Sequence, residues 1–266
     1  MELQEQYKKL QAQGYGIAAI SYDSQEILKG FADRKGITYP LLSDAGSKVI
    51  RSFGIFNESI PNDRGSYGVP HPGQYIVNPQ GVVQAKYFED AYAERVTASS
   101  MLTRFFNKSP DAVGQAETDE LTMSWSISNQ SARSGQHLTL ILDVQLKDKM
   151  HVYAPGVEDF IPVAWTLSES NLYTGAAAEF PEPEVLELKA IGKKAPVYHQ
   201  SFRIIQDITI AGNKTLTQGL GNLREQDRPL EIAGTFSYQA CDDQVCFFPQ
   251  KIPVSITVTI QSAESK

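Results

Sequence analysis

Hydrophobic positions follow two different periodicities along the chain. The first hundred residues mix helical spacing, as at Leu3, Tyr7 and Leu10, with short extended runs such as 16–21, which is apolar on both faces. This pattern predicts the element order α-β-α-β-α-β-β-α. The first three predicted helices end at Gly14, Gly36 and Gly54, and the fourth covers about 92–106. Three of the four predicted strands have clear bounds, at 16–21, 74–77 and 82–88.

The second predicted helix has a local start signal. Asp23 is followed three residues later by Glu26, which resembles a capping box. We therefore expect Asp23 to cap this helix.

After about residue 120 the pattern becomes an alternation of period two. Residues 138–146 and 252–260 each place every second apolar side chain on one face, and shorter extended segments lie between them. Many short strands without a helical stretch predict a sandwich of antiparallel sheets. Because the preceding polar segment lacks periodicity, we expect an α/β domain at 1–107, a linker at 108–120 and an all-β domain at 121–262.

Composition agrees with two domains and narrows the possible partners. A chain of 266 residues is long for a single core. No run approaches the roughly 18 apolar residues of a membrane helix, so no membrane insertion is predicted. The net charge of -7 disfavours nucleic acid as a partner, because such a partner requires a basic surface. The first residues lack the basic start and apolar stretch of a signal peptide.

The first part resembles the redoxin family, which includes alkyl hydroperoxide reductases and thiol-specific antioxidant proteins. The resemblance is carried by GIAAISYDSQEILKGFADRKGITYPLLSDAGSKVIRSFGI and by VPHPGQYIVNPQGVV, within about residues 2–107. It implies a thioredoxin fold in which Pro72, preceded by His71, is a cis-proline facing the active site. We therefore expect a cis His71–Pro72 bond.

The same resemblance implies that two elements of the family fold are missing before residue 1. They are a strand and the start of the helix that carries the catalytic cysteine. No cysteine occurs in residues 1–240, so this part lacks the thiolate that peroxide reduction requires. We expect no peroxidase activity from this chain alone, two inner strand edges without partners, and a true start upstream of Met1. An antioxidant enzyme of the peroxiredoxin type, with its catalytic cysteine upstream, remains an alternative.

The second part resembles the N-terminal domain of the thiol:disulfide interchange protein DsbD, an immunoglobulin-like sandwich. The resemblance is carried by MHVYAPG at 150–156 and FSYQACDDQVCFFP at 236–249, although the best-known members have one more residue between the cysteines. It implies a redox-active pair, Cys241 and Cys246, an extracytoplasmic, periplasmic location, and a thioredoxin-like exchange partner.

The spacing of the two cysteines also predicts a disulfide. The four residues between them suit a hairpin loop with the sulfurs facing each other across its base. So short a ring adds only about 2 kcal/mol as a staple, which favours exchange over a structural role. Tyr238, Phe247 and Phe248 are candidates to shield the sulfurs, or are ordinary strand packing.

Two alternatives remain for the pair. In the first alternative, the disulfide only locks a loop in a non-catalytic binding sandwich, and a reduction potential below about -300 mV would indicate such a structural bond. A zinc site of Cys241, Cys246, His151 and His199 is disfavoured by the wide histidine spacing. The sequence therefore predicts neither a metal nor a cofactor, and we expect a Cys246→Ser variant to trap a mixed disulfide.

Overall fold

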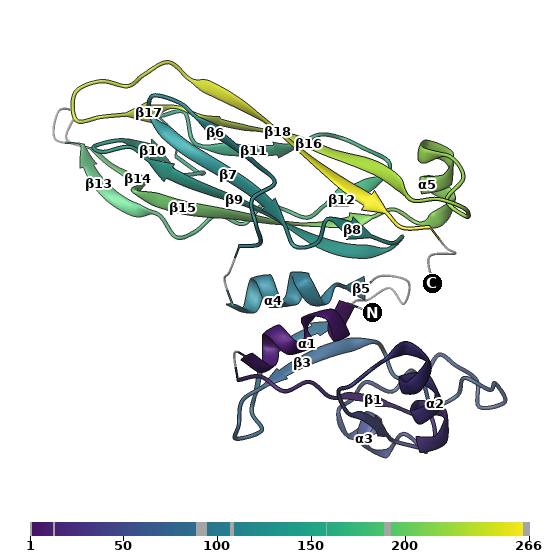
Figure 1. The fold of residues 1–266 in the computed structure, drawn as a ribbon. Coiled ribbons are helices and arrows are strands. Elements are labelled where there is room, and N and C mark those ends of the chain that lie inside the picture. The colour runs from purple at the N-terminus through teal and green to yellow at the C-terminus, as the bar shows by residue number, and fades with distance from the viewer. Residues whose placement is uncertain are drawn as a thin grey trace. The chain divides into compact units, whose positions relative to one another are not determined.

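The computed structural model describes residues 2–12, 14–88, 95–106, 109–157, 159–188 and 193–262. The chain divides into two compact units, Met1–Met101 and Leu102–Lys266. Each unit is described by itself, and Figure 1 shows the elements of both.

The N-terminal unit follows the predicted order of elements, with one short strand added. Residues 92–94 of the last predicted helix lie outside the described residues. The elements are α1 (Glu2–Ala12), β1 (Ala19–Ser21), α2 (Gln25–Lys35), β2 (Leu41–Ser43), α3 (Lys48–Ser52), β3 (Gly73–Val77), β4 (Val83–Phe88), β5 (Arg95–Val96) and α4 (Ala98–Phe106), which crosses the unit boundary.

Helix α2 is capped by Ser24, not by Asp23 as predicted. The Ser24 hydroxyl accepts a hydrogen bond from the Ile27 N–H at 3.3 Å, which is the usual N-cap contact. Asp23 instead accepts a hydrogen bond from the Ser21 hydroxyl at 2.6 Å, so its carboxylate is turned towards β1. The predicted end is confirmed, because Gly36 adopts a left-handed conformation with φ 62°.

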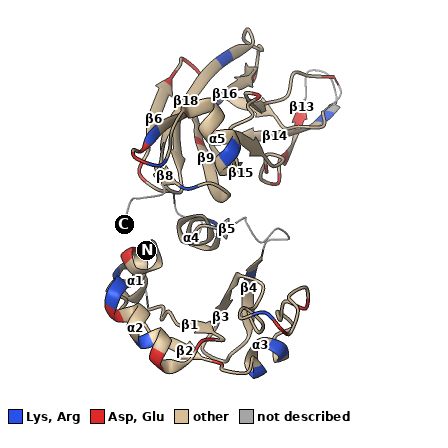
Figure 2. Cartoon of the chain, turned by 90° about the vertical axis from the view of Figure 1, so that its right-hand side faces the viewer, with Lys and Arg blue, Asp and Glu red and all other residues tan. Residues whose placement is uncertain are grey.

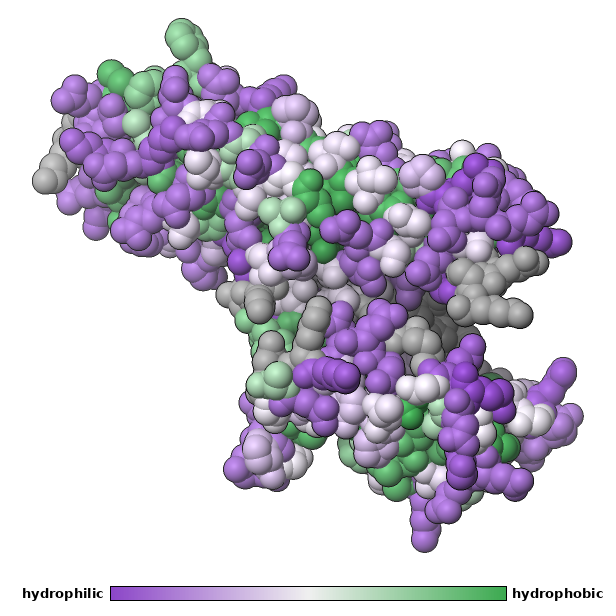
Figure 3. Space-filling model, in the orientation of Figure 1, coloured by the Kyte–Doolittle hydropathy of each residue, from purple (hydrophilic) through white to green (hydrophobic). Residues whose placement is uncertain are grey.

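The strands of this unit form two separate pairs. β1 pairs with β2 in parallel, and β3 pairs with β4 in antiparallel orientation. No strand in the described part of the chain joins the two pairs, in agreement with the expected unpaired edges. Figure 2 shows acidic and basic residues interspersed along α1 and α2, and Figure 3 shows hydrophobic side chains on the surface of this unit. The exposed apolar residues include Ile20, Ile27, Phe31 and Leu42.

The prediction of a cis bond before Pro72 is wrong. No cis peptide bond occurs among the described residues, so His71–Pro72 is trans. The trans form is lower in energy by about 0.5 to 1 kcal/mol in X–Pro bonds. The surrounding backbone is already paired in this form, since His71 donates to the Ile55 carbonyl at 2.7 Å and Phe56 bridges to Pro70.

The second unit is the predicted β-sandwich. The strands of its two main sheets follow the orders β12-β15-β9-β7-β6 and β11-β16-β18-β8. A smaller sheet has the order β13-β14-β10-β17. The elements are β6 (Gly114–Glu117), β7 (Leu121–Ile127), β8 (Ser131–Ala132), β9 (Gln136–Leu146), β10 (His151–Tyr153), β11 (Ala164–Leu167), β12 (Tyr173–Gly175), β13 (Glu184–Leu188), β14 (Lys193–His199), β15 (Ser201–Ile210), α5 (Asn213–Leu220), β16 (Arg228–Tyr238), β17 (Ala240–Cys241) and β18 (Gln250–Ile260).

The core of this unit comes from the alternation seen in the sequence. Strand β18 alternates strictly between exposed and buried residues, and β9 contributes Leu138, Leu140 and Leu142, all at most 1% exposed. Helix α5 was not expected, and it adds the buried Leu216. These positions form one contiguous apolar core, which is where most of the folding free energy of the unit arises.

The predicted linker is partly structured. Strand β6 lies inside 108–120 and pairs with β7, where the Trp125 ring fills the space that a side chain on Gly114 would need. The unit boundary falls inside α4, and Arg104 of that helix binds Asp207 and Glu179 of the sandwich unit, each at under 3 Å. These two carboxylates outweigh burial and raise the pKa of Arg104. The sandwich therefore begins before residue 121.

Candidate functional site

Strand β10 brings the candidate residues together. It lies between β14 and β17, and its residue His151 is the direct partner of both His199 and Cys241. Directly opposed residues of antiparallel strands place their side chains on the same face of the sheet. His199, His151 and Cys241 therefore form a row across one face.

The opposite face of these three strands belongs to the main core. Because side chains alternate along a strand, the neighbours of the row point the other way. Val152, Tyr198 and Ala240 occupy that second face and are all buried in the main core. The row of His199, His151 and Cys241 thus lies on the side of the sheet that does not carry the sandwich core.

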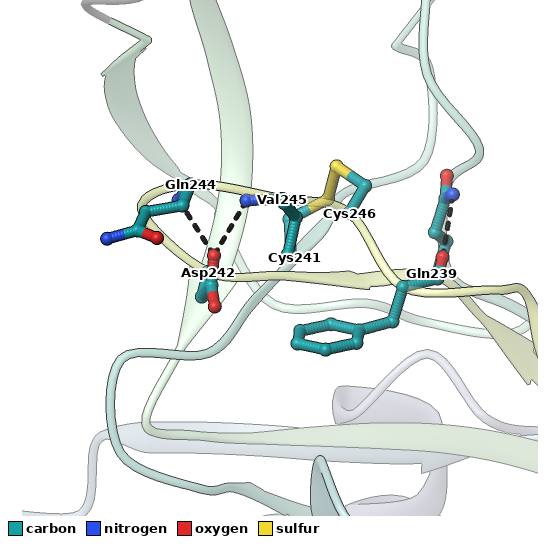
Figure 4. The surroundings of a disulfide bond; sticks show 7 residues. Gln239, Cys241, Asp242, Gln244, Val245 and Cys246 are labelled. Atoms are coloured by element: carbon teal, nitrogen blue, oxygen red, sulfur yellow. Dashed lines mark hydrogen bonds between the residues drawn. A yellow bond between two sulfur atoms is a disulfide. The ribbon is translucent and has the colours of Figure 1, made fainter.

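Cys241 and Cys246 form the predicted disulfide. Their sulfurs are 1.95 Å apart, their Cα atoms are 3.9 Å apart, and the two residues make an antiparallel bridge. The loop between them is closed by a hydrogen bond from the Asp242 N–H to the Val245 carbonyl at 2.9 Å. Figure 4 shows the sulfurs joined at the base of this hairpin.

Asp242 stabilises the loop through its side chain. One carboxylate oxygen accepts hydrogen bonds from the backbone N–H groups of Gln244 and Val245, both at 2.7 Å (Figure 4). The Val245 and Gln244 N–H groups lower the pKa of Asp242, because they stabilise its charged form. The Asp242 carboxylate therefore stabilises the turn, and its negative charge also disfavours a thiolate at the neighbouring cysteines.

The two sulfur-bearing residues differ sharply in exposure. Cys241 is only 1% exposed, whereas Cys246 is exposed to solvent. Thiol–disulfide exchange requires an attacking thiolate to reach a disulfide sulfur from outside. Of these two residues, Cys241 is closed to another protein and Cys246 lies at the surface.

A small satellite cluster covers Cys241. Buried Tyr153, Ala195 and Val197 surround it, and the partly buried residues packed against the cluster are Val157, Phe160 and Leu186. The Phe160 ring stacks on Tyr153 with centroids 4.0 Å apart and an interplanar angle of 10°. Burial also raises the pKa of Tyr153. These residues, absent from the sequence prediction, shield the inner sulfur.

The three aromatic residues predicted to shield the pair have different surroundings. Phe248 is 88% exposed and covers nothing. Tyr238 is buried in the main core, where its hydroxyl donates to Glu120 at 3.0 Å and lies 2.8 Å from the Thr118 hydroxyl. Phe247 also packs against the main core. Ordinary strand packing therefore accounts for Tyr238, whereas shielding of the sulfurs by Phe247 stays a prediction.

His151, which the sequence suggested only as a disfavoured zinc ligand, is a candidate for a different role. It is 6% exposed, and its Nε2 has no hydrogen-bond partner among the residues that the structure describes. Burial lowers the pKa of His151 and His199 contributes in the same direction, against the opposing effect of Asp243 and Asp242. The imidazole is therefore neutral near pH 7.

Three of the four residues considered for a zinc site lie on one sheet face, but their contacts are not those of zinc ligands. His199, His151 and Cys241 share a sheet face, yet the sulfurs are joined to each other and zinc binds thiolates. His199 faces Glu184 instead, with 3.3 Å between Nε2 and the carboxylate oxygen. Within the described ranges, no group of three or more His, Cys, Asp or Glu is arranged to hold a metal ion.

Comparison with family models finds two matches. Residues 1–86 match the AhpC/TSA family, and residues 118–257 match the family described as "Thiol:disulfide interchange protein DsbD, N-terminal". None of the helices in the described part of the chain is both long and apolar enough to cross a membrane.

Individual relatives and solved structures are similar to parts of the chain. Alkyl hydroperoxide reductase C from Staphylococcus aureus is 31% identical over 88 residues, which are 32% of this chain and 43% of the relative. The chain thus spans less than half of the length of these relatives. The N-terminal periplasmic domain of ScsB from Proteus mirabilis aligns with a TM-score of 0.36 and 12% identity, over 57% of this chain and 53% of that chain. The reduced N-terminal domain of DsbD from Neisseria meningitidis aligns with a TM-score of 0.30 and 16% identity, over 46% and 82%.

Proposed function

Because the chain belongs, through residues 118–257, to the family of the N-terminal domain of thiol:disulfide interchange protein DsbD, we propose that it is a thiol–disulfide oxidoreductase module. Cys241 and Cys246 alternate between dithiol and disulfide, and the partner is a protein of thioredoxin fold that carries its own pair of cysteines. Residues 1–86, which match the AhpC/TSA family, contain no cysteine and so supply no thiol to the exchange.

The difference in exposure between the two cysteines carries this proposal. A partner thiolate attacks the exposed Cys246 sulfur, the bond between Cys246 and Cys241 breaks, and Cys241 leaves as a thiolate. The second thiolate of the partner then attacks the partner sulfur that is bonded to Cys246, and Cys246 leaves as a thiolate. The sandwich pair is reduced by two electrons and the partner pair is oxidised.

This order of attack reverses the trapping variant expected from the sequence. Cys246→Ser would keep only the buried sulfur of Cys241, which a partner does not reach. Cys241→Ser keeps the exposed nucleophile and removes the sulfur that would resolve the mixed disulfide. Cys241→Ser is therefore the variant that should accumulate a covalent complex.

The test uses a thioredoxin-fold protein whose second cysteine is replaced by serine and whose first cysteine is activated as a mixed disulfide with thionitrobenzoate, so that the partner cannot release a trapped chain. Each single-serine chain is incubated with it in reduced form, followed by non-reducing electrophoresis and mass spectrometry. We expect a covalent complex with Cys241→Ser and almost none with Cys246→Ser. A complex with Cys246→Ser alone, or with neither variant, would overturn the proposal. The reduction potential of the unmodified chain gives a second criterion, because structural disulfides lie below about -300 mV.

A further inference from the structure

The surroundings of Cys241 create a problem for its chemistry. Once the disulfide is reduced, this sulfur is enclosed by apolar side chains and has Asp242 and Asp243 close by. Burial and negative neighbours both favour the thiol over the thiolate. Closing the disulfide again requires the thiolate, so a nearby group has to take the proton.

His151 is the group placed to do so. It is the residue directly opposite Cys241 on the neighbouring strand, and such pairs have Cβ atoms about 4.5 to 5.5 Å apart. Its Nε2 is buried without a hydrogen-bond partner among the described residues, which is unfavourable for a polar atom. In the disulfide, Cys241 has no proton to share. In the dithiol, its S–H can donate to this nitrogen.

We propose that His151 is the proton acceptor for Cys241 when the reduced pair transfers electrons to a partner disulfide. This inference rests on the proposed function. First, the Cys246 thiolate attacks a partner sulfur, the partner disulfide breaks, and the other partner sulfur leaves with the electron pair. Then the Cys241 proton moves to His151 Nε2, the Cys241 thiolate attacks the Cys246 sulfur, and the partner leaves as a second thiolate.

The charged neighbours of His151 are consistent with this role. Asp242 and Asp243 face it from the loop, His199 from β14 and Cys241 from β17, and its ring also meets Tyr153 edge-on at 5.5 Å. Burial, which lowers the pKa of His151, outweighs the two carboxylates, so the neutral base is the form present near pH 7. The carboxylates then stabilise the imidazolium that forms when the proton is transferred.

The test separates the two chemical steps with oxidised glutathione as the partner disulfide. Reduced wild-type and His151→Gln chains are mixed with glutathione disulfide, quenched with acid and analysed by mass spectrometry. The glutathione adduct on Cys246 reports the first step, and its conversion to the internal disulfide reports the second. Glutamine keeps a hydrogen-bond acceptor but does not take up a proton.

We expect the first step to be unchanged in His151→Gln. The second should slow by about 100-fold at pH 7, the low end of what a positioned general base contributes, and recover as the pH rises towards the pKa of the thiol. His199→Gln is the matched control, because His199 lies on the same sheet face one strand farther from Cys241. This variant removes the effect of His199 on the pKa of His151 but keeps the His151 imidazole, so it should leave the first step unchanged and change the second far less than His151→Gln does. Fluorescence of Trp125 and Trp165, the two tryptophans of the chain, checks that each variant is folded.

The outcomes distinguish the two proposals. An adduct that forms and resolves equally fast in wild type and in folded His151→Gln overturns the role of His151 and leaves the exchange function standing. The absence of any adduct or ring closure in the wild type overturns the exchange function itself. Equal slowing in His151→Gln and His199→Gln would assign the effect to the sheet face in general and would also overturn the inference.

Discussion

Reduction of the Cys241–Cys246 disulfide should weaken the sandwich only slightly. The disulfide closes a ring with a sequence separation of 5, so it removes little entropy from the unfolded chain. The chain-entropy treatment gives about 2 kcal/mol for such a ring at 25 °C. The main core does not include either cysteine, so its packing should survive reduction.

The measurement is guanidinium unfolding with and without dithiothreitol, followed by tryptophan fluorescence. Both tryptophans, Trp125 in β7 and Trp165 in β11, belong to the sandwich unit, so the signal excludes the N-terminal unit. The loss of about 2 kcal/mol corresponds to a fall in Tm of roughly 4 to 8 °C for a unit of this size. A Cys241→Ala, Cys246→Ala chain is the control, and dithiothreitol should not change its unfolding.

A large effect would refute this reasoning. If reduction removes more than about 4 kcal/mol, or unfolds the sandwich without denaturant, the bond is a structural staple beyond what its ring size explains. Such a domain would lose its fold whenever it accepted electrons. The binding sandwich with a locked loop would then be the better interpretation.

Two further predictions separate core residues from residues that cover the sulfur. Tyr238→Phe removes the hydroxyl that donates to Glu120, so it should destabilise the sandwich by about 1.5 to 3 kcal/mol in denaturant unfolding without changing the rate of exchange at Cys246. Phe160→Ala removes a stacking partner worth about 0.5 to 1.5 kcal/mol, so bromobimane should label Cys241 up to about tenfold faster in a Cys246→Ser chain. Phe248→Ala is the control, and an equal acceleration there would contradict the assigned cover.

The sandwich strands were predictable because their two faces meet different surroundings. In β18, every second residue enters the main core and the others face solvent, so the period of two is visible in the sequence. Helix α5 was missed because it is short and has Leu216 as its buried residue, too few apolar positions for a helical pattern to stand out. Gly212 and Gly221 at its ends were the available signal.

The candidate site was predictable only where it is local in sequence. Cys241 and Cys246 face each other across one short hairpin, so spacing alone indicated the bond. The role of His151 depends on the register of β10 against β17, two segments far apart in the chain, and periodicity carries no information about such pairings. Phe248 was misassigned as a shielding residue for the same reason, because it is close to the cysteines in sequence but is exposed to solvent in the fold.

The two faces of the β14, β10 and β17 strands separate stability from chemistry. Val152, Tyr198 and Ala240 anchor one face in the main core, and the disulfide and its histidine lie on the other, beneath a separate small cluster. Because core packing resists even small changes in shape, a bond that breaks and reforms inside it would strain the whole sandwich. On the satellite face, the rearrangement is confined to a few side chains and one short loop. A buried sulfur can therefore change its oxidation state there without changing the fold that positions it.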